Sequence, residues 1–377
     1  MAIQNQILNQ TVRKKNGSNK SSNINLQQLM KIIELAKWAP TPDNCQPFTF
    51  QWNGTSLNII SHLEFAEHAY NTNNIPTIIS LGSLLEYIYQ ASLSEGYYAN
   101  IEIPSTLNFG KSCAKIKFTN TFKKNHSLVK KLKERSTDRR SFKGGEISNV
   151  IEVAQKSNQY KEVKVNGYSL KDSSVIKSLT LMETTCFRWH KASKDLLKWL
   201  RLTKKEVKST DSGLPYKNLG LPFKEILAIR FLRRFFFLSK LFAPLAIFNY
   251  GQQMKSCLRS SAGILNLSVE STDFKSLVKL GRTATSIWLD LNEQGYGVQP
   301  LSQSSLLPSS LKSNIATIDA PKNVLTALQK GWSELQKKSP SQESKLVWSF
   351  RVGLSDSLPE SMRTKRRSLV DLLKVIE

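Results

Sequence analysis

The segment from Leu26 to Ile60 constrains the fold most, because it predicts a helix, a stiff loop and a β-hairpin in direct succession. Apolar residues three and four positions apart give a helical stripe over residues 26–38. The prolines at positions 40 and 42 end this helix. Strand-like residues then stand on both sides of Asn53-Gly54, which is a strong hairpin signal.

The rest of the chain continues this mixture of helices and strands and predicts an α+β protein. Two long helices stand out because each ends at a glycine of the type that caps helices, and each contains a glycine near its start. The expected elements are helices over 75–96 and 274–294, with glycines at 82 and 96 and at 281 and 295, and strands over 114–119, 262–269 and 347–354. Residues 296–302 are expected to leave the second helix as a strand and then a loop.

The composition indicates the class of protein and of binding partner, but it says little about the activity. Residues 1–25 are rich in Asn, Gln, Ser and Lys, which predicts a mobile tail. The formal net charge of +25 suggests an anionic partner, which leaves nucleotides, nucleic acids and membrane surfaces open. No helix-turn-helix, zinc-finger or RNP-like pattern is visible, so we expect no nucleic-acid role.

The cysteines and histidines predict neither disulfides nor a metal site. The four cysteines are far apart, form no CxxC pair and, with only four histidines, offer no zinc-like spacing. We expect reduced, mostly buried thiols. The N-terminus shows no signal pattern and no run is long and apolar enough to span a bilayer, so we expect a cytoplasmic protein without stable membrane insertion.

The basic segment Glu134–Gly145 is the first candidate binding element. Arg135, Thr137 and Arg139 alternate, so in extended chain their side chains point the same way. Two guanidiniums and a hydroxyl suit a phosphate or an electron-rich ring edge. A solvated basic loop is the alternative.

The loop Ala39–Pro47 is the second candidate. Its prolines make it stiff, and Thr41, Asn44 and Gln46 supply polar groups. A rigid polar loop at a helix end suits ligand recognition, although it equally suits a helix-to-strand corner.

Residues 187–260 differ from the rest in holding sixteen Lys and Arg against four Asp and Glu, together with the aromatic run 231–238. One interpretation is a helical lid, or a dimer contact, with an aromatic face over a pocket. The other is an amphipathic helix on an anionic membrane.

Five motifs together resemble the nitroreductase-like flavoprotein family, whose members hold FMN at a dimer interface. The resemblance covers most of residues 26–377. Its pieces are the Ala39–Pro47 loop (like Ala-Pro-Ser-x-x-Asn-x-Gln-Pro), Arg135-x-Thr137-x-Arg139, the helix 281–294 with Gly295-Tyr296-Gly297, the strand Arg351-Val352-Gly353, and the basic pair Lys365-x-Arg367.

The order of these pieces departs from short family members, where the Arg-x-Ser-x-Arg motif precedes the Asn-x-Gln-Pro loop. We therefore expect one chain with two pseudo-repeated, nitroreductase-like halves, 26–130 and 131–377, the second carrying the 187–260 insertion. This resembles a large branch of the family in which one chain mimics the dimer, and a further homodimer stays open. One FMN site per chain is expected.

The resemblance implies an FMN-dependent NAD(P)H oxidoreductase that passes hydride through flavin N5 to a nitroaromatic, quinone or similar acceptor by a ping-pong cycle. No catalytic side chain is implied. A lidded FMN-binding or sequestering protein with little turnover is the alternative. The implied cofactor contacts are Pro40, Thr41, Asn44, Gln46, Arg135, Thr137, Arg139, Pro300, Leu301, Ser302, Gln303, Arg351, Lys365 and Arg367.

Overall fold

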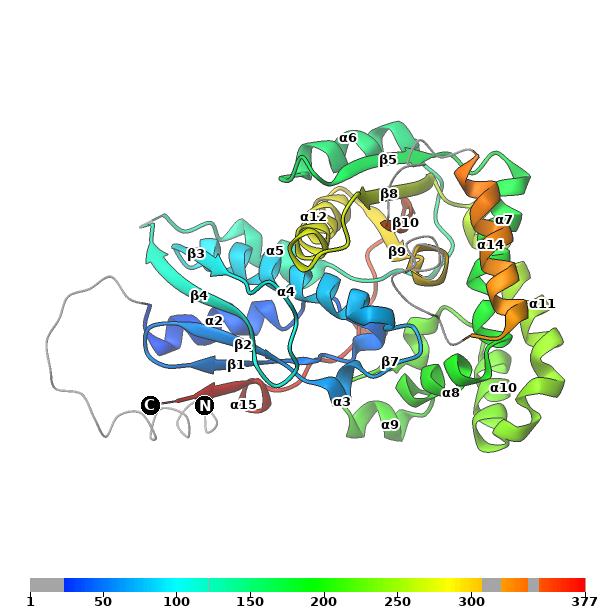
Figure 1. The fold of residues 1–377 in the computed structure, drawn as a ribbon, viewed down its shortest axis with the longest axis horizontal. Helices are drawn as coiled ribbons and strands as arrows, with labels where there is room; N and C mark the ends of the chain where they lie inside the picture. Colours follow the sequence, from blue (N-terminus) through cyan, green and yellow to red (C-terminus); the bar gives the residue numbers. More distant parts are fainter. Residues whose placement is uncertain (1–23, 122, 307–319, 338–345, 377) are drawn as a thin grey trace, which may run out of the picture.

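The computed structural model describes residues 24–121, 123–306, 320–337 and 346–376 of the 377-residue chain. The predicted N-terminal tail lies outside this part except for its last two residues. Two mainly antiparallel sheets stand apart, with a pair of long helices between them and a helical region at one end (Figure 1). The α+β class predicted from the sequence is confirmed.

The first sheet has the strand order β11-β1-β2-β4-β3 and is covered by α2 and α4. The predicted hairpin is present, because β1 and β2 pair in antiparallel register with Phe50 opposite Ile59. Asn25 caps the start of helix α2, where its side chain accepts a hydrogen bond from the backbone N–H of Gln28. The elements of this unit are α2 (Leu26–Ala36), η1 (Pro42–Asn44), β1 (Phe48–Trp52), β2 (Leu57–Ser61), α3 (Leu63–Ala66), η2 (Thr72–Asn74), α4 (Ile75–Ser94), β3 (Tyr97–Glu102), β4 (Ser112–Asn120) and α5 (Ser127–Glu134).

The second sheet has the order β5-β8-β10-β9 and packs against α6 and α12. Strand β8 is buried along its whole length, as expected for an inner strand of a covered sheet. The elements of this unit are α6 (Ile147–Ser157), β5 (Lys164–Tyr168), β8 (Gly263–Val269), α12 (Phe274–Glu293), β9 (Tyr296–Pro300), α14 (Lys322–Gln336) and β10 (Leu346–Leu354).

Helices α4 and α12 cross at two glycines. A Cβ atom at Gly82 would lie 2.2 Å from the carbonyl oxygen of Val278, and one at Gly281 would lie 2.0 Å from that of Ile79. Any larger residue at either position would therefore push the two backbones apart. The glycines noted in the sequence allow this close crossing, which joins the two sheets through one continuous apolar core.

The two sheets share the same succession of elements. Each sheet has its first four strands in the spatial order first, second, fourth, third, with antiparallel neighbours. Each places a 20-residue helix between its second and third strands, with glycine at the eighth position. Gly96 and Gly295 follow these helices with φ values of 84° and 82°.

Two segments cross from one sheet to the other. After β10 the chain passes η6 (Glu360–Met362) and α15 (Leu369–Leu372), and β11 (Leu373–Val375) joins the first sheet parallel to β1. In the other direction, the segment after α5 reaches the second sheet, where the backbone N–H of Lys143 donates to the carbonyl of Leu354 at 2.7 Å. The predicted Arg135 segment and the basic C-terminal segment are these two connections.

The segment between β5 and β8 contains the insertion predicted over 187–260. Its elements are α7 (Ser173–Glu183), η3 (Thr185–Phe187), α8 (His190–Trp199), β6 (Leu200–Arg201), α9 (Lys204–Ser209), β7 (Leu214–Pro215), η4 (Tyr216–Leu219), α10 (Phe223–Arg234), η5 (Phe236–Leu238) and α11 (Ser239–Arg259). These elements bury two apolar clusters of their own, one of them shared with α14. All four cysteines are buried and unpaired.

Candidate functional site

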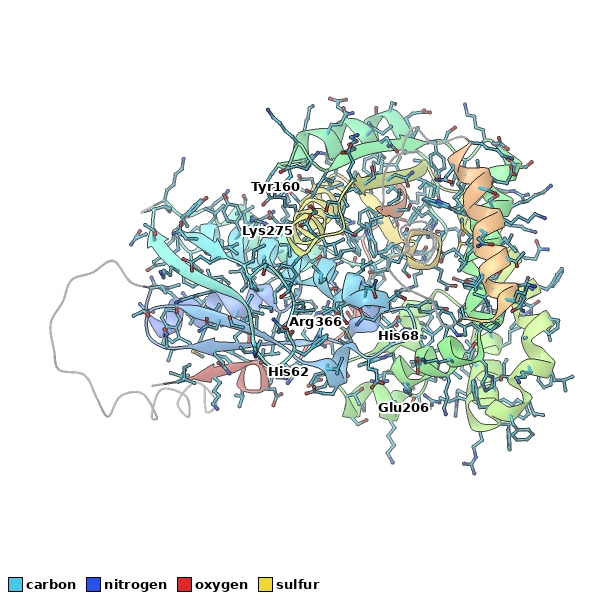
Figure 2. The ribbon with its side chains drawn as sticks, in the orientation of Figure 1. His62, His68, Tyr160, Glu206, Lys275 and Arg366 are labelled. Carbon is cyan, nitrogen blue, oxygen red and sulfur yellow. The ribbon has the colours of Figure 1, made fainter. Side chains whose placement is uncertain are left out.

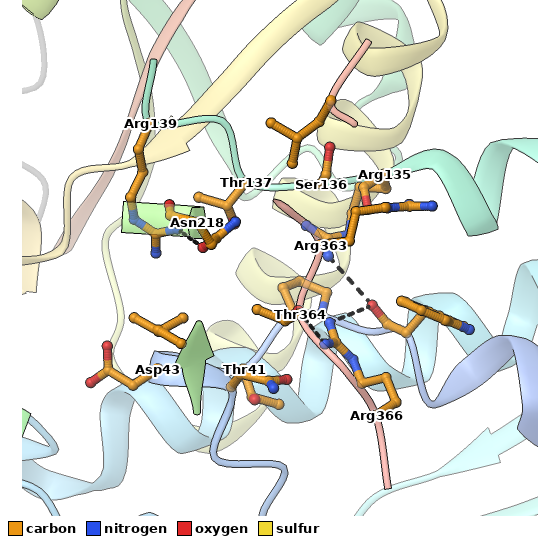
Figure 3. A pocket seen from close by; sticks show the side chains of 15 residues that line it. Thr41, Asp43, Arg135, Ser136, Thr137, Arg139, Asn218, Arg363, Thr364 and Arg366 are labelled. Carbon is orange, nitrogen blue, oxygen red and sulfur yellow. Dashed lines mark hydrogen bonds between the residues drawn. The ribbon is translucent and has the colours of Figure 1, made fainter. Parts of the chain in front are cut away.

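A cavity of about 60 Å³ lies where the two crossing segments, the Ala39–Pro47 loop and the insertion meet (Figure 3). Four arginines line it, Arg135, Arg139, Arg363 and Arg366, and we therefore call it the arginine cavity. Figure 2 places Arg366 near the middle of the molecule. The remaining lining residues are Trp38, Pro40, Thr41, Asp43, Asn44, Ser136, Thr137, Leu214, Asn218, Leu358 and Thr364.

None of the four arginines forms an ion pair with a carboxylate among the described residues. Asp43 lines the same cavity and raises the pKa of Arg139, against the larger effect of burial, which lowers it. Burial, and after it the neighbouring charge of Arg135, lower the pKa of Arg366 to about 9. Positive charge is thus concentrated here, because Asp43 is the one carboxylate among the lining residues and it also lies 3.2 Å from His68.

Arg135 is almost fully buried and is fixed on three sides. Its Nε donates to the hydroxyl of Tyr87 at 2.8 Å, and its Nη2 donates to the carbonyl of Trp38 at 3.4 Å. Its guanidinium lies 4.4 Å from the centre of the Trp288 ring. The Nη1 group has no hydrogen-bond partner, which is costly for a buried charged donor.

Arg366 enters the cavity from the C-terminal crossing segment. Its Nη2 donates to the same Trp38 carbonyl at 3.4 Å, and its guanidinium lies 5.3 Å from the Trp38 ring centre. Its Nε is buried without a partner. Arg363, three residues earlier, donates to the carbonyl of Arg135 at 3.2 Å and so ties the two crossing segments together.

Arg139 closes the cavity against the insertion. Its Nη1 donates to the side-chain oxygen of Asn218 in η4, as Figure 3 shows. Asn218 in turn donates to the carbonyl of Met362 at 2.8 Å. The first part of the insertion therefore borders the cavity, whereas its aromatic run 231–238 does not line it.

The Ala39–Pro47 loop carries backbone strain. Asp43, Asn44 and Gln46 all have positive φ, at 47°, 56° and 51°, although none is a glycine. The hydroxyl of Thr41 holds the loop by accepting a hydrogen bond from the Gln46 N–H at 3.1 Å. Strain of this kind persists where surrounding contacts enforce it, and it is common at binding sites.

The amides of this loop bind other parts of the chain. Asn44 Nδ2 donates to the carbonyls of Gly213 at 3.1 Å and Lys365 at 3.0 Å. Gln46 donates to the carbonyl of Asp211 at 2.7 Å and accepts from the Arg367 N–H at 2.9 Å. The loop thus fastens both the insertion and the C-terminal segment beside the cavity.

Arg351 lies away from the cavity lining and is fully buried. It donates to Gln299 Oε1 at 2.9 Å, to the carbonyl of Cys257 at 3.1 Å and to that of Arg140 at 2.8 Å. Burial lowers its pKa to about 10. Its contact with the Arg140 carbonyl makes it a positioning residue for the Arg135–Arg139 segment.

The predicted residues 300–303 also stand outside the cavity lining. Pro300 pairs with Phe350 in the sheet, Leu301 is buried, and Ser302 is exposed. Gln303 Oε1 accepts from the Thr185 hydroxyl at 3.1 Å and from the Cys186 N–H at 3.2 Å, so η3 covers this loop.

The predicted basic pair, Lys365 and Arg367, does not line the cavity, whereas Arg363 and Arg366 do. Lys365 reaches the carbonyl of Lys208 at 3.4 Å, and the guanidinium of Arg367 lies 5.1 Å from the Phe65 ring centre. Of the sequence-predicted contacts, the cavity brings together Pro40, Thr41, Asn44, Arg135, Thr137 and Arg139.

Sequence reasoning missed the arginines at 363 and 366, although both stand close to the predicted pair Lys365 and Arg367 in the sequence. No local signal distinguished them, because the direction of each side chain depends on how the segment crosses to the first sheet. Leu214 and Asn218 carried no signal either.

Glu183 is a buried carboxyl beneath the covered loop. It accepts a hydrogen bond from the Ser304 N–H at 2.8 Å, yet burial raises its pKa to about 7. It therefore titrates near neutral pH inside the protein.

No protein-family model matches this chain, and no curated protein sequence does. Among solved structures it is similar to the FMN-dependent nitroreductase NfnB from Mycobacterium smegmatis in complex with NADPH, at 14% identity and a TM-score of 0.35, over 67% of this chain and 98% of that one. A likeness at this TM-score establishes neither fold nor function, and the cavity residues have to carry the functional argument.

Proposed function

We propose that this chain binds FMN through the arginine cavity and acts as an FMN-dependent oxidoreductase with NAD(P)H as electron donor. The observation that carries the proposal is the set of four cavity arginines, none of which forms an ion pair with a carboxylate within the described part of the chain. Such a cluster is costly unless an anion joins it. Arginine is well suited to phosphate because its planar fork can donate two parallel hydrogen bonds.

The residues present fit the phosphate end of FMN. Arg135 Nη1 and Arg366 Nε are buried donors without partners, and the hydroxyl-bearing residues Thr41, Thr137 and Thr364 also line the cavity. A volume of about 60 Å³ suits a phosphate-sized group. It is smaller than the ~300–1,000 Å³ of pockets that enclose a drug-sized molecule. Binding of the whole cofactor therefore requires the bordering segment at Leu214 and Asn218 to move.

FMN, when bound, would supply the redox chemistry, taking hydride from NAD(P)H and delivering it to a nitroaromatic, quinone or similar acceptor. The chain's own task is to hold the phosphate and keep positive charge close to the cofactor. Arg135 and Arg139 contribute from one crossing segment, and Arg363 and Arg366 from the other. The strained loop at Asp43 and Asn44 forms a fixed part of the cavity lining.

A second function, tight FMN binding with little turnover, is favoured by the insertion. Leu214 and Asn218 border the cavity, and the backbone N–H of Cys186 binds Gln303, one of the predicted cofactor contacts. Both contacts restrict access by a second substrate.

We also infer that the two sheets are repeats of one unit, so that one chain mimics a dimer. The equal strand orders, the two 20-residue helices and the glycines at their eighth positions support this inference. The Ala39–Pro47 loop stands beside the first sheet, and Arg135–Arg139 beside the second. We therefore expect one FMN per chain.

The test is the visible spectrum of the purified chain, with FMN released and counted. We expect one FMN per chain, and loss of binding in the double variant Arg135→Ala, Arg139→Ala. The matched control is Arg230→Ala, Arg234→Ala, which removes two exposed arginines from α10. Circular dichroism establishes that both variants fold.

A colourless protein that cannot be reconstituted with FMN would overturn the proposal, as would full FMN binding by the cavity variant. Steady-state NADPH oxidation with a quinone acceptor then separates the two functions. Rapid turnover indicates the oxidoreductase. FMN retained at full stoichiometry without turnover indicates the second function.

A further inference from the structure

The second part of the insertion exposes an unusual number of large apolar side chains. They come from α10, η5, α11 and the residue between α10 and η5, and we call them the hairpin face. Phe237, Leu241 and Phe223 are exposed by 76%, 71% and 69%. The hairpin face consists of Phe223, Leu227, Phe231, Phe235, Phe237, Leu241, Phe242, Leu245 and Phe248.

The spacing of these residues aligns them along both helices. Positions 223, 227 and 231 follow each other by four residues on α10, and 241, 245 and 248 by four and three on α11. The rings of Phe231 and Phe242 join the two helices, with centroids 6.4 Å apart. The face is therefore one surface, and exposed apolar surface of this kind marks a site of association.

Contacts on the inner side hold the hairpin face outward. Ile226 is buried against Leu200, Leu202 and Leu214. On the same helix, Arg233 forms an ion pair with Glu206 of α9. Figure 1 shows α10 and α11 at the outer edge of the molecule, on the side away from β3, β4 and α2.

Basic residues accompany this apolar surface. Lys224, Arg230, Arg234 and Lys240 are exposed, and none of them has an ion pair among the described residues. From Ile226 to Val269 the sequence contains no Asp or Glu. Glu225 is therefore the one acidic residue of α10, η5 and α11, and the surroundings of the hairpin face are predominantly positive.

We propose that the hairpin face docks peripherally on an anionic lipid surface, with its aromatic and leucine side chains entering the interface and its basic residues contacting lipid phosphates. Aromatic and leucine side chains combined with Lys and Arg are the composition of helices that lie in a membrane interface. Within the described residues no helix is long and apolar enough to cross a bilayer. The hairpin lies on the membrane rather than across it.

Charge favours a lipid surface over a second copy of the chain. A two-fold contact would bring the same patch of each copy together, and with it Arg230, Arg234 and Lys240 of both copies. No acidic residue of α10 after Glu225, of η5 or of α11 could compensate. An anionic bilayer instead attracts each such basic residue, and each one raises the affinity roughly fivefold.

The experiment is flotation of the purified full-length chain with vesicles. One set contains phosphatidylcholine alone, and the other contains phosphatidylcholine with phosphatidylglycerol. We expect binding to the anionic vesicles only, weakening as salt is added. The variant Arg230→Gln, Arg234→Gln, Lys240→Gln should bind roughly 100-fold more weakly, because three charges lose their attraction to the anionic surface.

The variant Phe237→Ser, Leu241→Ser, Phe248→Ser should lose at least roughly tenfold in binding per buried side chain. The matched control Lys111→Gln, Lys115→Gln, Lys123→Gln removes three exposed lysines at or beside β4, across the molecule from the hairpin in Figure 1. It should bind like the wild type.

Three outcomes would overturn the proposal. One is absence of binding to anionic vesicles at low salt. Another is equal binding by the charge variant and the lysine control. The third is a dimer in light scattering that the Phe237, Leu241 and Phe248 variant abolishes, without vesicle binding by the wild type, since a second copy would then occupy the face.

Discussion

Replacing Glu183 by Gln should stabilise the protein above neutral pH. The carboxyl is 5% exposed, and burial raises its pKa from 4.5 to about 7. The folded state therefore binds this proton more tightly than the unfolded state does, so the free energy of unfolding falls as the pH rises from 4.5 towards 7. At ~1.4 kcal/mol per pKa unit, the carboxylate costs about 3 kcal/mol at alkaline pH.

The Glu183→Gln variant keeps a side-chain oxygen that can accept the hydrogen bond from the Ser304 N–H, and the amide carries no charge. In urea unfolding we expect this variant to exceed the wild type by about 3 kcal/mol near pH 8, and by much less near pH 5. The control is Glu67→Gln, which removes a carboxylate from an exposed position.

A constant difference between Glu183→Gln and the wild type from pH 5 to 8 would refute the reasoning, since it would mean that Glu183 does not titrate in this range. The same pH dependence in the Glu67→Gln control would refute it as well, because the effect would then follow total charge.

Three other changes test the crossing, the cavity and the segment between them. Gly281→Ala places a Cβ 2.0 Å from the Ile79 carbonyl oxygen, so it should lower the free energy of unfolding in urea by at least ~1–3 kcal/mol. The control Gly251→Ala, whose Cβ would make an ordinary contact at 3.5 Å, should not lower the free energy of unfolding measurably. Arg366→Lys keeps the charge but loses the planar fork, and calorimetry should find FMN bound roughly tenfold more weakly with riboflavin, which has no phosphate, unchanged; equal losses for both would place the phosphate elsewhere. Burial raises the pKa of Asp138, but hydrogen bonds from Arg140 and Ser355 lower it more, so the pKa is lowered overall. Asp138→Asn should therefore be less stable than the wild type at pH 7, and this difference should vanish as the pH falls below ~4. A difference that persists in acid would contradict this assignment.

The candidate site could be predicted in part, because two of its segments carry dense local signals. Prolines and polar residues marked the Ala39–Pro47 loop, and alternation marked Arg135 and Arg139. The C-terminal basic pair Lys365 and Arg367 was also singled out, but the cavity is lined by Arg363 and Arg366 instead. In an extended segment, neighbouring side chains point to opposite sides, so a shift of one residue changes which side chains face the cavity. No local sequence pattern determines that shift.

Gln303 shows a second reason why the sequence predicts the site only in part. Its loop follows β9 as the sequence predicts, yet Thr185 and Cys186 occupy its side-chain oxygen. These two residues come from a much earlier part of the chain, on the other side of the whole insertion. Long-range packing of this kind has no counterpart in the local sequence.

The sequence alone determined the elements: the helix ended by prolines, the Asn-Gly hairpin, the two long helices with their glycines, and the basic insertion with its aromatic run. These depend on backbone preferences and on apolar spacing over a few residues, which the chain carries locally. Only the tertiary structure decided that Gly82 meets Gly281, that the segments after β4 and β10 exchange sheets, and that four arginines converge without a carboxylate partner in the described part of the chain. Those outcomes depend on which distant surfaces pack together to bury the shared core, and that packing is a property of the whole chain.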